Sequence, residues 1–152
     1  MVHYLIDSIN NLDLWLNKTL GRVTMITASS FEEFKNQFST LLKDEYYSKT
    51  ESVVYIWKVE KPIPRLIGES NILYIGRTKN SFSSRYSTKK AMEIELGYYE
   101  SVYQHVIQTY GSISIEIRSV SDTKLAETIA LHEYFNCHRE LPPMNRSMPK
   151  LN

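Results

Sequence analysis

The sequence has few residues of the kinds that would hold a small domain together covalently or through a metal. It contains one cysteine, Cys137, so no intramolecular disulfide can form and a secreted disulfide scaffold is excluded. With four histidines beside that cysteine, a structural zinc site is not expected. The 152 residues are nevertheless enough for one compact domain with its own hydrophobic core.

Long apolar runs are also missing. A membrane-spanning helix needs about 20 consecutive apolar residues, and the apolar runs in this sequence extend over only a few. The N-terminal segment lacks the basic region, the apolar stretch and the cleavage site of a signal peptide. We therefore expect no membrane partner and a cytoplasmic location.

Neither sign of charge dominates the chain. Lys and Arg number 18 and Asp and Glu 17, and a net charge of +1 argues against a generally basic nucleic-acid binder. The positive charge is locally concentrated, however, in a window without acidic residues that holds Arg77, Lys79, Arg85, Lys89 and Lys90. Arg85 and Lys89 would share one face of a helix and reach one phosphate; the alternative is a solvated basic helix face.

Local patterns predict an α+β fold. Apolar spacing predicts a helix over residues 5–20, Arg22–Thr27 is a candidate short strand, and Ser30 with Glu33 forms a capping box that opens a second helix. These first 50 residues are expected to form an N-terminal helical, accessory layer.

Residues 51–152 are expected to form the core module of a single compact domain. The expected strands are Val53–Val59, Ile72–Gly76 and Ile113–Arg118, and the expected helices are Phe82–Glu95, Tyr99–Tyr110 and residues 122–139. The order β-β-α-α-β-α predicts a small three-stranded antiparallel sheet flanked by helices. Pro62 and Pro64 are expected to end the first strand, which leaves a long loop before the second.

One glycine and one carboxylate stand at unusual places. Gly76 is one of five glycines and follows Tyr74 at a strand end, where it allows a close approach of backbone or ligand. Counted in steps of four residues along the last predicted helix, Glu133 falls on the same line as Leu125. That line is expected to be apolar and to face the core, where a carboxylate needs a bound cation or an ion-pair partner. Glu127 is expected to project to a different, solvated side.

These residues follow one another in an order that resembles the GIY-YIG nuclease family. The resemblance covers roughly Val53–Asn145, with Val53-Val54-Tyr55 in place of the first motif and Tyr74-Ile75-Gly76 as the second. The matching residues that follow are Arg85 on a helix, Glu133 on the last helix and Asn145 after Pro142-Pro143-Met144.

The resemblance implies a metal-dependent endonuclease that hydrolyses phosphodiester bonds of double-stranded DNA. It implies that Glu133 holds Mg²⁺ or Mn²⁺ and that Arg85 grips the scissile phosphate. Tyr74 or Tyr55 would orient or deprotonate the attacking water, with Lys89 as an alternative proton relay, and the sequence does not decide between the tyrosines.

The resemblance also implies roles outside the chemical step. Arg77, Lys79, Lys89 and Lys90 are expected to contact DNA, and Gly76 and Asn145 to be structural residues near the site. Because few residues follow Asn145, we expect a compact stand-alone member, similar to restriction enzymes or phage-encoded nucleases, acting in a bacterial or phage-infected cell. A homodimer would allow both strands to be cut. The alternative function is a non-catalytic nucleic-acid-binding module on the same fold.

Overall fold

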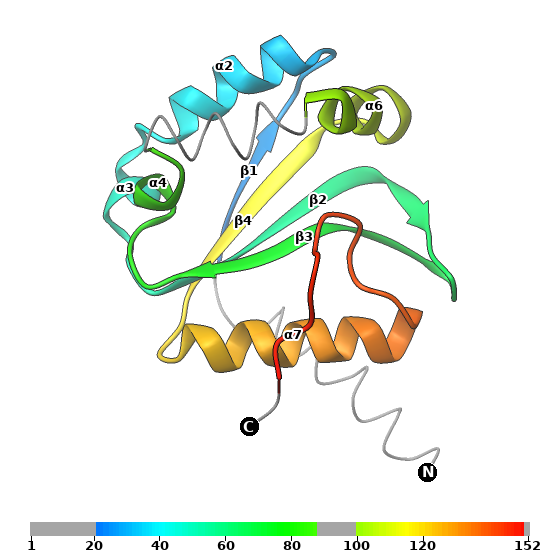
Figure 1. Cartoon of the computed structure of the whole chain (residues 1–152). Coiled ribbons are helices and arrows are strands. Elements are labelled where there is room, and N and C mark those ends of the chain that lie inside the picture. The colour runs from blue at the N-terminus through cyan, green and yellow to red at the C-terminus, as the bar shows by residue number, and fades with distance from the viewer. Residues whose placement is uncertain (1–20, 88–99, 151–152) are drawn as a thin grey trace.

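The computed structural model describes residues 21–87 and 100–150. The elements are β1 (Arg22–Ile26), α2 (Phe31–Leu41), α3 (Glu45–Lys49), β2 (Val53–Pro64), β3 (Glu69–Thr78), α4 (Phe82–Tyr86), α6 (Glu100–Tyr110), β4 (Ile113–Ser119) and α7 (Thr123–His138) (Figure 1). In these two ranges no helix has the length and apolar character needed to cross a membrane. The predicted helix over residues 5–20, Lys89, Lys90 and the end of the predicted helix Phe82–Glu95 lie outside the described residues.

The strands β1, β4, β2 and β3 lie side by side in that order in one antiparallel sheet. This confirms the α+β class, but the predicted three-stranded sheet is wrong because β1 adds a fourth strand. Arg22–Ile26 pairs along its whole length with Ile113–Ile117 of β4. The β propensity of the five residues of β1 is visible in the sequence. Nothing in those five residues shows that the distant strand β4 has a free edge with which they can pair.

The sheet separates two layers of helices. In Figure 1, α2, α4 and α6 lie on one side of the sheet and α7 on the other. Successive side chains of β2 point to opposite sides of the sheet. Tyr55 and Trp57 pack with the first set of helices, while Val54 and Ile56 pack with α7. We call these two sides the aromatic face and the α7 face.

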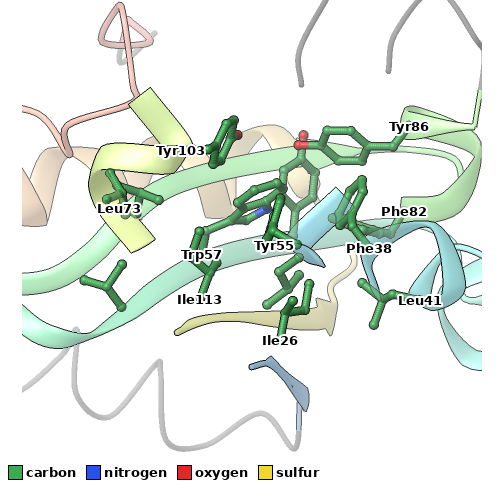
Figure 2. Close-up of a cluster of buried hydrophobic side chains, with 14 of the residues drawn as sticks. Ile26, Phe38, Leu41, Tyr55, Trp57, Leu73, Phe82, Tyr86, Tyr103 and Ile113 are labelled. Atoms are coloured by element: carbon green, nitrogen blue, oxygen red, sulfur yellow. The ribbon is translucent and has the colours of Figure 1, made fainter. Parts of the chain in front are cut away.

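An aromatic core fills the aromatic face (Figure 2). The ring centroid of Trp57 lies 5.6 Å from that of Phe38 on α2, 5.9 Å from Tyr86 on α4 and 5.8 Å from Tyr103 on α6. Aromatic pairs at such separations add stability beyond the area they bury. Because Phe38 precedes residue 50 and Trp57 follows it, the two predicted segments contribute to one core.

β2 and β3 form the predicted hairpin, but the expected long loop is wrong. β2 continues through Pro62 to Pro64. The pairing with β3 shifts register between Lys58 and Ile63, and β4 pairs with β2 only as far as Val59. The two prolines therefore lie beyond the paired part of β4, where the missing backbone N–H of a proline breaks no hydrogen bond to that strand. The hairpin turn closes with the Arg65 N–H donating to the Gly68 carbonyl at 2.9 Å.

Local signals set the helix ends. The Ser30 hydroxyl caps α2 by accepting from the Glu33 N–H at 3.2 Å, while the Glu33 carboxylate accepts from the Ser29 N–H at 2.8 Å. Asp122 caps α7 by accepting from the Leu125 N–H at 3.0 Å. α7 ends at His138, and Arg139 follows in the left-handed conformation with φ of 58°.

Replacing Arg139 with glycine should stabilise the protein. A left-handed conformation costs a residue with a Cβ roughly 1–2 kcal/mol, and the greater freedom of glycine in the unfolded chain offsets part of that gain. We expect Arg139→Gly to raise the melting temperature by about 2–4 °C in scanning calorimetry. Arg146→Gly, at a position without positive φ, is the control and should give no rise. A lower melting temperature for Arg139→Gly would contradict this account of the helix end.

Candidate functional site

The two tyrosines of the predicted site lie next to each other on the aromatic face. Tyr55 pairs with Gly76 and Trp57 pairs with Tyr74 across β2 and β3, so Tyr55 and Tyr74 project from the same side of the sheet. Their ring centroids are 6.0 Å apart. Tyr55 is only 1% exposed, whereas Tyr74 is half-buried at the border of the core.

Gly76 is required by the Tyr55 ring. A Cβ at position 76 would lie 2.4 Å from Cε2 and 2.7 Å from the hydroxyl oxygen of Tyr55. Both separations are shorter than any van der Waals contact, so the ring occupies the space that a side chain at position 76 would need. The glycine is therefore fixed by close packing on the partner strand, which is the kind of approach that its place in the sequence indicates.

Helix α4, which carries Arg85, packs against Tyr55. The Ser81 hydroxyl caps the helix by accepting from the Ser84 N–H at 3.1 Å. Phe82 and Tyr86 anchor it, with ring centroids 5.2 Å and 5.8 Å from that of Tyr55. Figure 2 shows the Tyr55 and Tyr86 side chains pointing toward one another. Arg85 is half-buried, and its guanidinium carbon lies 5.7 Å from the Tyr86 ring centroid.

The structure does not bring Glu133 to this face. Glu133 belongs to α7, and the sheet lies between α7 and the helices that pack on Tyr55. The predicted core-facing line is also wrong, since Leu125 is 53% exposed and the buried face of α7 instead contains Ala126, Ala130 and Tyr134. Glu133 is half-buried at the border of that face. Two adjacent lines of residues spaced four apart on α7 both carry apolar side chains, so this spacing does not show which line faces the core.

The carboxylate of Glu133 has an unusual environment. Its Oε2 is buried and has no hydrogen-bond partner among the described residues. Burial raises the pKa of Glu133, since a charged carboxylate loses hydration there. An orphaned carboxylate oxygen suits a hard divalent cation, which accepts one protein carboxylate and completes its shell with water and phosphate oxygens. Among the described residues, however, no group of three or more His, Cys, Asp or Glu side chains forms a ready-made metal cage.

The prediction that Glu127 lies on a solvated side of the last helix is wrong. Glu127 is half-buried, and its Oε2 accepts from Arg77 Nε at 2.9 Å, so the ion pair joins β3 to α7. Burial raises the pKa of the Glu127 carboxyl, and the Arg77 charge opposes part of that rise. Helical position alone could not show this partner, because Arg77 lies on a different element.

Asn145 binds the outer edge of the sheet. Its Oδ1 accepts from the Ile75 N–H at 3.0 Å and its Nδ2 donates to the Ile75 carbonyl at 2.8 Å, as a neighbouring strand would. The Met144 N–H donates to the Leu73 carbonyl at 3.0 Å. Because β3 is an edge strand, these bonds fix the segment that follows α7 beside the strand that carries Tyr74.

Arg77 and Lys79 line a cavity of about 520 Å³ at one end of the sheet. Lys124, at the start of α7, lines the same cavity and was missed by sequence reasoning because it lies outside the basic window. Lys89 and Lys90 fall outside the described residues.

Comparison of the chain with protein-family models, with curated proteins and with solved structures finds no match. The placement of the side chains is therefore what bears on function.

Gly76→Ala should destabilise the protein through its clash with Tyr55. We expect the free energy of unfolding to fall by about 1–3 kcal/mol, the usual cost of overpacking a core. Tyr55→Leu removes the ring atoms nearest position 76, so the double variant should lose less stability than the two single losses added together. Urea denaturation of all four proteins measures this coupling. Simple additivity would show that the ring does not limit position 76.

Arg77→Met should destabilise the protein in a pH-dependent way. The Glu127 side chain is only 17% exposed, and the variant would leave it without its cation. We expect the free energy of unfolding to fall by about 1–3 kcal/mol at pH 7. The pKa of Glu127 in the folded state, already raised by burial, would rise further, so the folded protein would bind a proton more readily than the unfolded chain. Stability is then recovered as the pH falls below the folded pKa, and the loss should shrink between pH 7 and pH 4.

Urea denaturation of wild type and variant across that pH range measures the effect. The control compares Glu127→Gln with Arg77→Met plus Glu127→Gln: neither has the titrating carboxyl, so the loss caused by Arg77→Met in this background should not vary with pH. A loss in Arg77→Met that stays constant from pH 7 to pH 4 would contradict the role of the ion pair.

Proposed function

We propose that the protein is a divalent-metal-dependent endonuclease that acts on double-stranded DNA. The observation that carries the proposal is the cluster on the aromatic face, where Tyr55 and Tyr74 lie on adjacent strands and α4, the helix that carries Arg85, packs on Tyr55 through Phe82 and Tyr86. Resemblance to the GIY-YIG nucleases rests on these residues and on Glu133 and Asn145 in the same chain order.

Phosphodiester hydrolysis assigns different tasks to these side chains. Arg85 would bind the phosphate and offset the negative charge that develops on it. A tyrosine would orient the attacking water or take its proton. Tyr74 is the better candidate for contact with water, since it is half-buried while Tyr55 is 1% exposed within the core.

Glu133 would hold the divalent cation. Its buried, unpartnered Oε2 is the feature of the described chain that best fits a hard cation. When bound, such a cation supplies charge neutralisation on the phosphate and on the leaving oxygen. A homodimer would let two such sites cut opposite strands.

One observation favours a second candidate, a non-catalytic nucleic-acid-binding module. Glu133 lies on α7, across the sheet from Tyr55 and α4. A binding module needs no carboxylate beside its phosphate contacts, whereas one catalytic site requires Glu133 and Arg85 to act on the same phosphate. The two candidates differ in whether Glu133 matters for cleavage.

Glu133→Gln should abolish metal-dependent cleavage without unfolding the protein. The amide keeps the shape of the side chain but is a poor ligand for a divalent cation. Because burial disfavours the charged carboxylate, the substitution should leave the melting temperature unchanged or raise it. Nicking of a supercoiled plasmid in Mg²⁺ or Mn²⁺, with an EDTA blank, measures activity.

The matched control is Glu32→Gln, which neutralises an exposed carboxylate on α2 and should cleave like the wild type. Equal nicking by wild type and Glu133→Gln would exclude Glu133 as the metal ligand. Retarded migration of DNA by the wild type without any nicking in either metal would favour the binding module.

A further inference from the structure

A cavity lies where three strands of the sheet meet α7. β2 begins there, β3 ends there, and the segment between β4 and α7 closes it. Its volume is about 520 Å³, within the roughly 300–1,000 Å³ common for ligand sites. The residues that line it are Ser52, Arg77, Lys79, Ser121, Asp122, Thr123 and Lys124.

Backbone hydrogen bonds fix the walls of this cavity. The Ser52 N–H donates to the Lys79 carbonyl at 3.0 Å, and the Val120 N–H donates to the Ser52 carbonyl at 2.9 Å. The ends of β3 and β4 are thus both tied to Ser52. Lys79 and the segment that leads to Lys124 are therefore held on opposite sides of Ser52.

Three cations line the cavity and leave donors available. Neither Lys79 nor Lys124 forms an ion pair with any residue the structure describes, and both are exposed. The ion pair of Arg77 with Glu127 uses Nε. Its terminal amino groups make no hydrogen bond within the described part of the chain, so that end of the guanidinium fork can bind an oxyanion.

Asp122 is the one carboxylate among the described residues of the lining, and it offsets only one of the three positive charges. Asp122 Oδ1 accepts from the Leu125 N–H at 3.0 Å and so serves its own helix. The other described residues of the lining are Ser52, Ser121 and Thr123, whose hydroxyl groups can donate to an anion. None of the described residues of the lining is aromatic or has a large apolar side chain, so none of them would stack on a nucleobase.

We propose that this cavity binds a phosphate group, and that on DNA it holds a backbone phosphate without reading the base. Recognition would come from Lys79, Lys124 and the guanidinium of Arg77. The DNA part of the inference rests on the proposed function, whereas binding of a phosphate group does not. Contacts of this kind position a duplex on a protein and carry no sequence information.

The test is DNA binding by the full chain in EDTA, where cleavage cannot interfere. The variant Lys79→Ala with Lys124→Ala should bind a duplex about tenfold more weakly. The slope of log affinity against log salt concentration should become shallower by roughly 1–2, since each phosphate contact contributes about −0.9. Both lysines are exposed, so the melting temperature should not change.

The matched control is Lys35→Ala with Lys43→Ala, which removes the same charge from exposed positions on and after α2. It should change affinity less than twofold and leave the salt slope unaltered. Equal weakening by the two double variants would show that only net charge matters and would overturn the proposal. Wild-type affinity in Lys79→Ala with Lys124→Ala would also overturn it.

A second arm uses inorganic phosphate, followed by NMR shifts of the backbone amides of Ser52, Ser121 and Thr123. Saturable shifts that disappear in Lys79→Ala with Lys124→Ala support the site, even if the wild type binds no duplex and the proposed nuclease function fails. Absence of such shifts together with absence of duplex binding overturns the site itself. Loss of cleavage in Glu133→Gln with unchanged duplex binding separates the catalytic proposal from this one.

Discussion

Strand β2 pairs with β3 on one side and, as far as Val59, with β4 on the other, and most of the structure depends on this double pairing. Its side chains must alternate between the two faces, so Tyr55 and Trp57 pack on the aromatic face while Val54 and Ile56 pack against α7. A shift of register by one residue would exchange the two sets. The contact between Tyr55 and Gly76 opposes such a shift between β2 and β3, because only a glycine fits against the ring.

The same alternation explains why β4 carries buried charge. Its sequence alternates strictly and predicts a half-buried strand with one polar face. The polar side chains Glu116 and Arg118 are instead 6% and 4% exposed. Arg118 Nε donates to Glu116 Oε1 at 2.7 Å, and Lys58 of β2 lies 3.4 Å from Glu116 Oε2. Removing any one of these three side chains would leave a buried charge without its partner. The three side chains therefore constrain the pairing of β2 with β4.

Features set by neighbours in sequence could be predicted, whereas features set by distant partners could not. Ser30 and Asp122 cap helices through bonds three residues away, and a capping residue carries that information in its own side chain. β1 is a strand of the sheet because β4 has an edge to pair with, and Glu127 is half-buried because Arg77 reaches it from β3. Neither partner is visible from the local pattern.

The candidate site divides in the same way. The proximity of Tyr55 to Tyr74 follows from the antiparallel pairing of two predicted strands. The side of the sheet on which Glu133 lies depends on where the last helix packs, and chain order alone does not decide that. For this reason the sequence identifies the individual residues of the proposed nuclease more readily than it predicts their arrangement.

Glu133 is the residue on which this arrangement places the strongest physical demand. A buried carboxylate oxygen without a hydrogen-bond partner is costly, and a native structure requires some group to compensate for it. A proton or a cation can do so, and the raised pKa of Glu133 is the sign of that demand when no cation is bound. The two compete for the same oxygen, because a cation binds the deprotonated form and its binding releases the proton. Glu127 shows the contrast on the same helix, since Arg77 supplies its positive charge from within the chain. Glu133 has no such partner among the described residues, so a proton or, under the proposed function, a divalent cation would supply that compensation.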